Sequence, residues 1–183
     1  MNFPIHNSKS APPAAKAILS GAAANFGFVP NMLGVMAEAP ALLTAYTTLS
    51  RIFDDTSLNA AERQVVLLAA SAENQCDYCM LAHSAIAAMQ AVPADAVCAI
   101  RDAEEIPDPT LEALRRFTVA VVASRGRPTD EDMAAFLTAG YGRQQILEVV
   151  LGVGMKTLSN YTNHIAATPP DDAFNAMASR KAS

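Results

Sequence analysis

Two of the three cysteines and one of the three histidines of this 183-residue chain fall within the stretch from Glu73 to His83. Cys76, Cys79 and His83 are spaced at i, i+3 and i+7, so in an α-helix their side chains would lie on one face. In a cytosolic chain, a Cys-x-x-Cys pair indicates redox or metal chemistry before a structural role. A histidine one turn beyond the second cysteine can take the proton from its thiol.

A cysteine attacks only as its thiolate, and a free thiol at neutral pH is mostly protonated. Cys76 falls where a helix is expected to begin, and unpaired backbone N–H groups there favour its anion. His83 is placed to accept the proton of Cys79, directly or through water. Glu73 can orient the imidazole or pass the proton onward. After the attack on an oxidant, the partner cysteine is close enough to form a disulfide.

Two other interpretations of the cysteine pair stay open. Two reduced cysteines could fill a helix interface. A zinc ion could bind, but zinc needs four protein ligands, or three with an open position, and the sequence has no second Cys-x-x-Cys pair. Only folding could bring further donors to the pair from His6, Cys98 or His164. We favour the redox interpretation and expect neither a metal nor another cofactor.

The other chemically active residues are expected to have structural roles. Cys98 lies alone in an apolar segment, which is typical of a core cysteine. His164 is expected to be packed or at an interface, and to face the site only if the repeat described below is real. Glu62 is an ordinary first-turn acid of a helix. Tyr78, inside the motif, either hydrogen-bonds a substrate oxygen or packs.

Proline, glycine and capping residues divide the chain into helical segments. The expected helices cover residues 14–25, 32–38, 40–53, 60–72, 76–90, 94–102, 111–124, 131–139 and 143–165. No alternating strand pattern and no Asn-Gly hairpin turn occurs. The sequence therefore predicts an all-α fold with a single compact domain over residues 1–183. Within it, the arm over residues 1–13 and the tail over residues 171–183 are expected to be less ordered.

The helix over residues 60–72 is apolar on nearly every side, which predicts a central position with the 76–90 helix packed beside it. Ser57 or Asn59 is positioned to cap its start. Residues 61–83 can also be laid over residues 142–164 without gaps. We interpret this match as a hint of two similar helix hairpins, the second of which carries no thiols.

The composition limits the kinds of molecule with which this chain is expected to associate. Hydrophobic residues make up 51% and charged residues 17% of the chain, which is apolar for a soluble monomer and predicts a homo-oligomer. The net charge of -5 and the lack of a basic cluster exclude nucleic acid as a partner. No apolar run approaches the roughly 20 residues that cross a bilayer, so no membrane partner is expected. Lys16 interrupts the best candidate for a signal-peptide core, which predicts a cytoplasmic location.

The motif from Glu73 to His83 and the apolar helix before it, residues 61–70, resemble the carboxymuconolactone decarboxylase superfamily. Within that superfamily they resemble the AhpD-like alkylhydroperoxidase branch. The resemblance is strongest over residues 40–88 and extends more loosely to residues 160–170. It implies an all-helical, AhpD-like fold that assembles as a homo-trimer or homo-hexamer, because members of the family do so.

The resemblance also implies roles for the motif residues, because redox members of the family use the two cysteines to reduce hydroperoxides. Cys79 would be the attacking thiol and Cys76 the resolving one. His83 would be the base, and a glutamate would join the proton relay. A dithiol donor, whose identity the sequence does not reveal, would return the disulfide to two thiols.

The chain departs from the family pattern at one position. The family often has a glutamate twelve positions before the first cysteine, where this chain has Gln64. Glu73 or Glu62 would have to replace it in the relay. The decarboxylase branch lacks the thiol pair, so the pair disfavours lactone decarboxylation. The predicted function is a peroxidase that reduces alkyl hydroperoxides, and the alternative is a non-redox decarboxylase-like enzyme or a metal-binding protein.

Overall fold

The computed structural model describes residues 2–179, and every regular element in that range is an α-helix. The helices are α1 (Pro13–Phe26), α2 (Asn31–Met36), α3 (Pro40–Asp54), α4 (Ala60–Glu73), α5 (Asp77–Met89), α6 (Ala94–Arg101), α7 (Pro109–Ala123), α8 (Asp130–Thr138), α9 (Arg143–Ala166) and α10 (Asp172–Ser179). The predicted all-α fold is therefore confirmed. The helices expected up to residue 165 all form, with ends that differ from the prediction by at most two residues.

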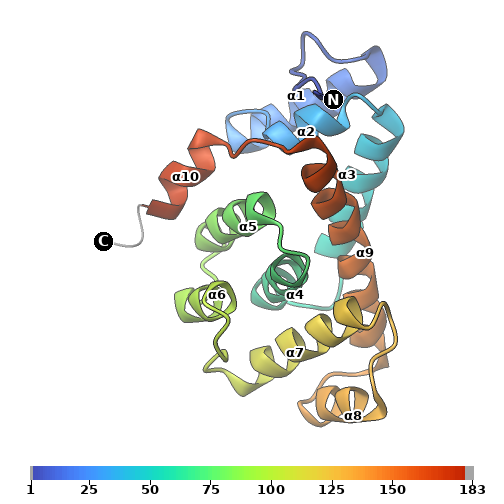
Figure 1. Cartoon of the computed structure of the whole chain (residues 1–183), viewed down its shortest axis with the longest axis vertical. Helices are drawn as coiled ribbons and strands as arrows, with labels where there is room; N and C mark the ends of the chain where they lie inside the picture. Colours follow the sequence, from blue (N-terminus) through green and yellow to red (C-terminus); the bar gives the residue numbers. More distant parts are fainter. Residues whose placement is uncertain (1, 180–183) are drawn as a thin grey trace.

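Helix α4 lies at the centre of the molecule, as its apolar sequence predicts (Figure 1). It contacts α3, α5, α6, α7 and α9, and every residue from Gln64 to Ser71 is buried. Asn59 caps its start, because the Asn59 side chain accepts from the Glu62 N–H at 3.0 Å while the Glu62 carboxylate accepts from the Asn59 N–H at 2.7 Å. Each fully buried aliphatic side chain on this helix contributes roughly 1.5–3 kcal/mol to folding.

Helix α9 runs beside α3 along one side of the molecule and packs across α4 (Figure 1). Gly152 permits this close approach. A Cβ atom at this position would lie 2.8 Å from Cγ1 of Val66 and 2.9 Å from ring atoms of Phe53. The backbone of α9 therefore passes directly over side chains of α3 and α4, which brings the next turns of α9 to the start of α5.

The second of the two suggested helix hairpins does not form. Residues 61–83 do form the α4–α5 hairpin, but residues 142–164 lie almost entirely in the uninterrupted helix α9. The first segment breaks at Gln75, whose φ of 55° ends α4. The residue aligned with Gln75 is Lys156, which lies in the middle of α9 with its side chain fully buried.

The arm and the C-terminal segment both pack against the helical body. In the arm, the His6 N–H donates to the Gly34 carbonyl at 3.1 Å, and the His6 ring contacts the Glu38 carboxylate at 2.7 Å. Within the expected tail, residues 172–179 form α10, and residues 180–183 lie outside the described part of the chain. Phe174 of α10 is buried, with its ring edge-on to Phe28 at a centroid distance of 5.3 Å.

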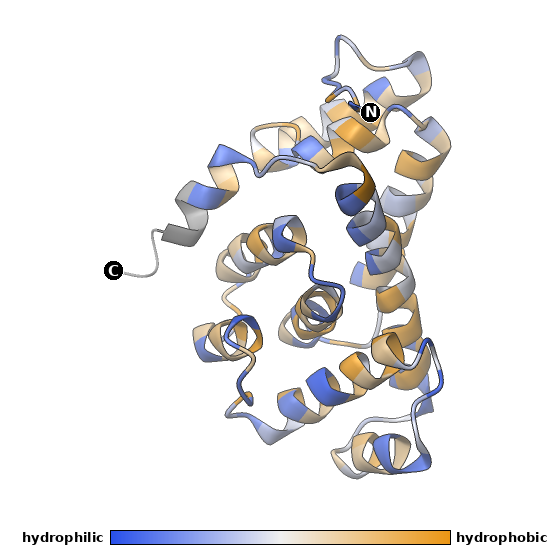
Figure 2. Ribbon diagram, in the orientation of Figure 1, coloured by the Kyte–Doolittle hydropathy of each residue, from blue (hydrophilic) through white to orange (hydrophobic). Residues whose placement is uncertain are grey.

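Hydrophobic and hydrophilic residues segregate along the chain. Figure 2 shows α4 as mostly hydrophobic, whereas the loop that leads from it to α5 is hydrophilic. Over residues 2–179, no helix combines the length and the hydrophobicity that crossing a bilayer requires.

Candidate active site

A tight turn between α4 and α5 places the first cysteine. The Cys76 N–H donates to the Ser71 carbonyl and the Gln75 N–H donates to the Ala72 carbonyl, both at 2.9 Å. These two bonds form a Schellman motif, with Gln75 in the left-handed conformation that such a motif needs. A non-glycine residue in this conformation costs roughly 1–2 kcal/mol. The turn reverses the chain, so that Cys76 is buried immediately before α5 begins.

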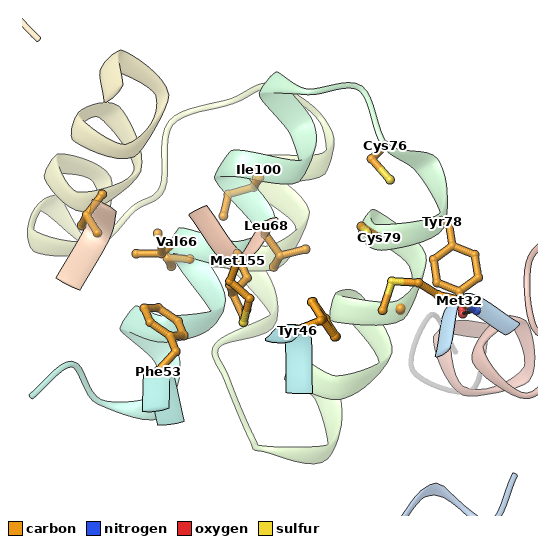
Figure 3. Close-up of a cluster of buried hydrophobic side chains, with 14 of the residues drawn as sticks. Met32, Tyr46, Phe53, Val66, Leu68, Cys76, Tyr78, Cys79, Ile100 and Met155 are labelled. Atoms are coloured by element: carbon orange, nitrogen blue, oxygen red, sulfur yellow. Dashed lines mark hydrogen bonds between the residues drawn. The ribbon is translucent and has the colours of Figure 1, made fainter. Parts of the chain in front are cut away.

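The structure brings the two cysteines together at the start of α5 (Figure 3). Cys76 is the N-cap residue and Cys79 lies in the first turn, each only 1% exposed and neither in a disulfide. The side-chain amide of Asn163 donates to Cys79 Sγ at 3.3 Å and to Cys76 Sγ at 3.8 Å. One amide group from α9 therefore contacts both sulfurs.

The two thiols are not equivalent. The Cys76 thiol donates a hydrogen bond to Cys79, which lowers the pKa of Cys79 and raises the pKa of Cys76. Burial opposes the Cys79 anion, whereas the positive charge of Lys156 and the hydroxyl of Ser159 favour it. The sequence led us to expect that the helix start favours the Cys76 anion, whereas in this pair Cys76 is the hydrogen-bond donor and the pKa of Cys79 is the lowered one.

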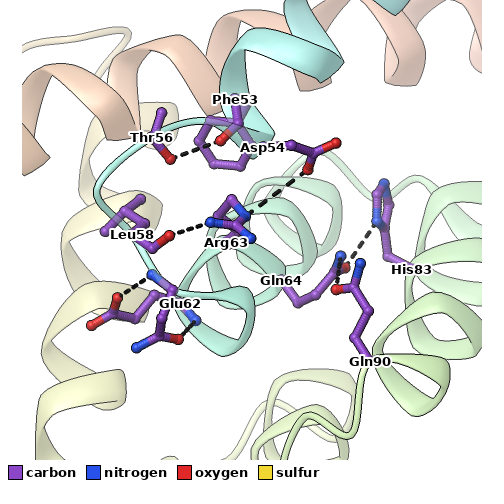
Figure 4. A network of polar contacts seen from close by, with 10 residues as sticks. Phe53, Asp54, Thr56, Leu58, Glu62, Arg63, Gln64, His83 and Gln90 are labelled. Carbon is purple, nitrogen blue, oxygen red and sulfur yellow. Dashed lines mark hydrogen bonds and ion pairs between the residues drawn. The ribbon is translucent and has the colours of Figure 1, made fainter.

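His83 lies one turn beyond Cys79, and its partner is an amide. His83 Nδ1 lies 3.1 Å from Gln64 Oε1, and Gln64 Nε2 donates to Gln90 Oε1 at 3.1 Å (Figure 4). In this arrangement Nδ1 carries the proton and Nε2 keeps its lone pair. Burial, followed by the charge of Lys156, holds the pKa of His83 well below 6.5, so the imidazole is neutral at physiological pH.

Neither glutamate named from the sequence holds the imidazole. Glu73 is exposed at the end of α4, and within residues 2–179 no hydrogen bond or ion pair joins it to His83. Glu62 uses its carboxylate to cap α4. Glu73, which the sequence suggests either to orient the imidazole or to pass the proton onward, does not contact the ring in the structure. Gln64 contacts the ring instead, because it lies on the buried side of α4, where that helix packs against α5.

A cavity of about 530 Å³ opens at the thiol pair. Of the two cysteines, Cys79 lines it and Cys76 does not. The polar side chains of the lining include Tyr46, Gln64, His83 and Lys156. Most of the remaining lining is apolar and comes from α1, α2, α3, α4, α5, α9 and α10, including Ile18, Phe26, Leu67, Ile86 and Met155. The cavity therefore offers one reactive sulfur at the wall of a mainly apolar chamber.

Three residues of α9 at this site were missed from the sequence. Lys156 is fully buried, Ser159 follows it by one turn and Asn163 by two turns, so all three lie on one face. Gly152, one turn before Lys156, is buried on the same face. The sequence did contain one indication of this site, which is a lysine that lies on the same helical face as small residues of a long predicted helix.

Two further candidates lie away from the site. Cys98 is exposed, so the expectation of a core cysteine is wrong. Its helix, α6, buries Ala96, Ala99 and Ile100 instead, and these residues occupy the opposite side. His164 is exposed on α9 and does not face the site. In the part of the chain that the structure describes, no three His, Cys, Asp or Glu side chains gather in an arrangement that could hold a metal ion.

Tyr78 connects the motif to the C-terminal segment. Its hydroxyl donates to Asp171 Oδ2 at 2.5 Å and accepts from the Met32 N–H at 3.2 Å. Asp171, itself buried, also accepts from the Asn31 N–H at 3.0 Å. Of the two roles considered for Tyr78, these contacts support packing, because both protein partners of the hydroxyl are already in place.

The model of the carboxymuconolactone decarboxylase family matches residues 37–120. A solved structure of a peroxidase-related protein from Ralstonia eutropha, described as an alkylhydroperoxidase AhpD core, is 24% identical with a TM-score of 0.83 and covers 97% of this chain and 95% of its own. A peroxidase-related protein from a Silicibacter species is 17% identical with a TM-score of 0.79 and covers 95% and 92%.

The debrominase Bmp8, in a variant complexed with 2,3,4-tribromopyrrole, is 19% identical with a TM-score of 0.81. The match covers 98% of this chain and 96% of that chain. No curated protein matches the chain. The family match confirms the predicted resemblance to the carboxymuconolactone decarboxylase superfamily, and the solved structures confirm the predicted AhpD-like fold.

Proposed function

We propose that this protein reduces organic hydroperoxides with the Cys76–Cys79 pair, and that Cys79 is the attacking thiol. One observation carries the proposal. The Cys79 thiol has a lowered pKa and lines the cavity. Cys76 does not line the cavity, and its buried thiol donates a hydrogen bond to the Cys79 sulfur. A reactive thiolate open to the cavity and a second thiol in contact with it are the two parts that a dithiol peroxidase needs.

In the proposed reaction, the Cys79 thiolate attacks the hydroxyl-bearing oxygen of the hydroperoxide. An S–O bond forms and the O–O bond breaks, so that Cys79 becomes a sulfenic acid and the peroxide becomes an alcohol once its oxygen is protonated. Cys76 then attacks the Cys79 sulfur, which forms the disulfide and releases water. A dithiol donor returns two electrons and two protons to the pair.

His83 is proposed as the base that accepts a thiol proton, directly or through water. Its Nδ1–H is engaged by Gln64, which leaves the lone pair of Nε2 available, and its lowered pKa keeps the ring neutral. Glu73 has no part in this scheme, because it is exposed at the C-terminal end of α4, whereas the partner of His83, Gln64, lies near the start of that helix.

The lining of the cavity supports a substrate with an apolar tail. Its volume of about 530 Å³ lies within the range of small-molecule sites, and the chamber is much larger than hydrogen peroxide requires. Phe26, Leu67 and Ile86 line it, and burial of apolar substrate surface against them contributes about 25 cal/mol per Å². We expect alkyl or aryl hydroperoxides to react better than hydrogen peroxide.

The test is a thiol count before and after one equivalent of cumene hydroperoxide. The wild-type chain has three thiols and is expected to lose two, while exposed Cys98 stays reduced. Cys98→Ser is the control and should still lose two thiols. Cys79→Ser should keep the one remaining thiol of the pair, Cys76, and should abolish turnover with dithiothreitol. No thiol loss in the wild type, or loss at Cys98 alone, would contradict the proposal.

Reductive debromination of an aromatic compound is the second candidate. The shared fold of a debrominase and the mainly apolar cavity favour it. In that reaction the same two thiols would supply two electrons, so that the carbon–bromine bond becomes a carbon–hydrogen bond and bromide leaves. Release of bromide from a brominated pyrrole in the presence of dithiothreitol, without turnover of hydroperoxides, would decide for this function.

A further inference from the structure

We propose that Lys156 is a catalytic residue, whose positive charge holds Cys79 as a thiolate and whose proton passes to the oxygen that leaves the hydroperoxide. The second part of this inference rests on the function proposed above. Lys156 lies in the middle of α9, about 80 residues from the cysteines in sequence, and lines the same cavity as Cys79.

The burial of Lys156 has no structural explanation. Its side chain is 0% exposed, and Nζ has no hydrogen-bond partner in the part of the chain that the structure describes. A buried ammonium without a partner costs several kcal/mol, and an apolar side chain of similar size would be more favourable there. A buried charged side chain without a partner is typical of a functional site, where its charge stabilises a bound ligand or a reacting atom.

The anion that the charge of Lys156 favours is the Cys79 thiolate. No carboxylate of the described residues forms an ion pair with Lys156. Asp54 also lines the cavity, but its carboxylate faces Arg63 at 3.9 Å. The hydrogen bond from Cys76 is the largest cause that lowers the pKa of Cys79, and the charge of Lys156 is the second. Both oppose the effect of burial, which raises this pKa.

The histidine cannot supply this charge. His83 is buried, neutral and held by the uncharged amide of Gln64. Lys156 is then the single cation among the described residues that line the cavity. Lys156 and Cys79 line the same cavity, in which a hydroperoxide would bind. A positive charge in a dry site stabilises developing anions far more than in water.

The proton balance closes with Lys156 as the donor. The Cys79 thiolate attacks the hydroxyl-bearing oxygen, and the alkoxide that departs takes a proton from Lys156 and leaves as an alcohol. The Cys76 thiol then attacks the sulfenic acid of Cys79, and its proton leaves with the hydroxyl group as water. When a dithiol donor reduces the disulfide, one of its protons returns to Cys76 and the other to Lys156.

The first test removes the charge with Lys156→Met, an unbranched replacement of similar length. We expect alkylation of Cys79 by iodoacetamide at pH 7 to slow about 10-fold or more, because the thiol pKa returns toward its ordinary value of about 8.5. We also expect an unchanged or higher melting temperature, because a buried unpaired charge is gone. Lys16→Met removes an exposed lysine and is the control that should change neither quantity.

An unchanged alkylation profile in K156M would overturn the assignment, as would a loss of stability without a change in thiol reactivity. If K156M does not yield folded protein, Lys156→Gln takes its place in the same measurements. The alkylation test needs no hydroperoxide, so it decides the role of Lys156 at Cys79 even if the proposed function fails.

The second test compares two oxidants whose leaving groups differ in basicity. We compare single-turnover oxidation of Cys79 by tert-butyl hydroperoxide, whose departing alkoxide is strongly basic, with oxidation by peracetic acid, whose departing carboxylate is not. At a pH where Cys79 is ionised in both proteins, K156M should lose about 10²-fold with the hydroperoxide and much less with the peracid. Equal losses would refute proton donation, and wild-type protein inert to both oxidants would instead refute the proposed function.

Discussion

Cys76 and Cys79 carry the same chemical group but differ in their surroundings. Cys76 donates to Cys79, so Cys76→Ala should remove the hydrogen bond that contributes most to the lowered pKa of Cys79. We expect the alkylation rate of Cys79 in the wild type to reach half its maximum below pH 8.5, and the midpoint to rise in C76A. The measurement is the iodoacetamide rate against pH in a Cys98→Ser background.

The opposite order of reactivity would reverse the roles. If Cys76 shows the lower pKa and His83→Ala leaves both profiles unchanged, the start of helix α5 activates the site and Cys76 attacks. The cysteines would then exchange roles, as in motifs where the first cysteine of the pair is the nucleophile.

Gln64 decides the charge of His83. Gln64→Glu places a carboxylate beside His83 Nδ1, and an opposite charge within hydrogen-bonding distance favours the protonated ring. We expect the pKa of His83, measured from its imidazole resonances by NMR, to rise from well below 6.5 in the wild type. Glu62→Gln is the control, because Glu62 caps α4 and should leave the His83 titration unaltered. An unmoved titration in Q64E would contradict the contact.

Because the pKa of His83 is lowered by folding, its titration also affects stability. Below about pH 6.5 the unfolded chain binds a proton at this residue while the folded chain does not. The free energy of unfolding contributed by His83 is therefore fully present above that pH and falls as the pH drops below it.

At the scale of the helices, α9 is the element that completes the site. Its register brings Lys156, Ser159 and Asn163 to the cysteines, and Gly152 sets how closely it approaches α3 and α4. A side chain at residue 152 would push α9 outward, and with it the three polar groups that surround Cys79.

Gly152→Ala tests this close approach. The added methyl group would lie 2.8–2.9 Å from Val66 and Phe53, so neighbouring atoms must shift. Overpacking of this kind costs about 1–3 kcal/mol, which outweighs the better helix propensity of alanine. Urea unfolding should show the loss. Gly21→Ala in α1, where a Cβ meets nothing within 4 Å, should instead stabilise by about 0.5–1 kcal/mol. Equal stability of G152A and wild type would refute the argument.

At the scale of the whole molecule, α9 carries large hydrophobic side chains on its outer face. These are Leu147 (70% exposed), Val150 (50%), Tyr161 (55%) and Ile165 (73%). They lie within one face of the helix. Two of them, Tyr161 and Ile165, line a groove of about 340 Å³, whose other lining residues are mainly apolar and come from the arm, α2, α3 and α9. Such a patch marks an interaction surface, and we propose that a second copy of the chain covers it in a trimer or hexamer.

The oligomer can be measured by light scattering at micromolar concentration. We expect three or six chains per particle for the wild type and smaller particles for Leu147→Glu or Ile165→Glu, because a charge would then be buried in the interface. Leu137→Glu on α8 is the control, since residue 137 is 43% exposed and lies on a different helix. A wild-type particle of one chain would contradict the proposal.

The sequence by itself determined the helices and the thiol pair. Helix periodicity, the Asn59 cap and the breaks at proline and glycine depend on residues within one or two turns of one another. The spacing of Cys76, Cys79 and His83 is likewise a property of one helix and its start. These interactions are local, so the residue order contains them before any packing is known.

Only the tertiary structure decided what surrounds the sulfurs. Asn163 contacts cysteines more than 80 residues away, and Gln64, rather than Glu73, meets His83 across the α4–α5 packing. Cys98 points outward because α6 buries its other face. Lys156 reaches the cavity because Gly152 lets α9 pass closely over α4. Each of these outcomes depends on which faces of separate helices pack together, and no spacing within one helix specifies that choice.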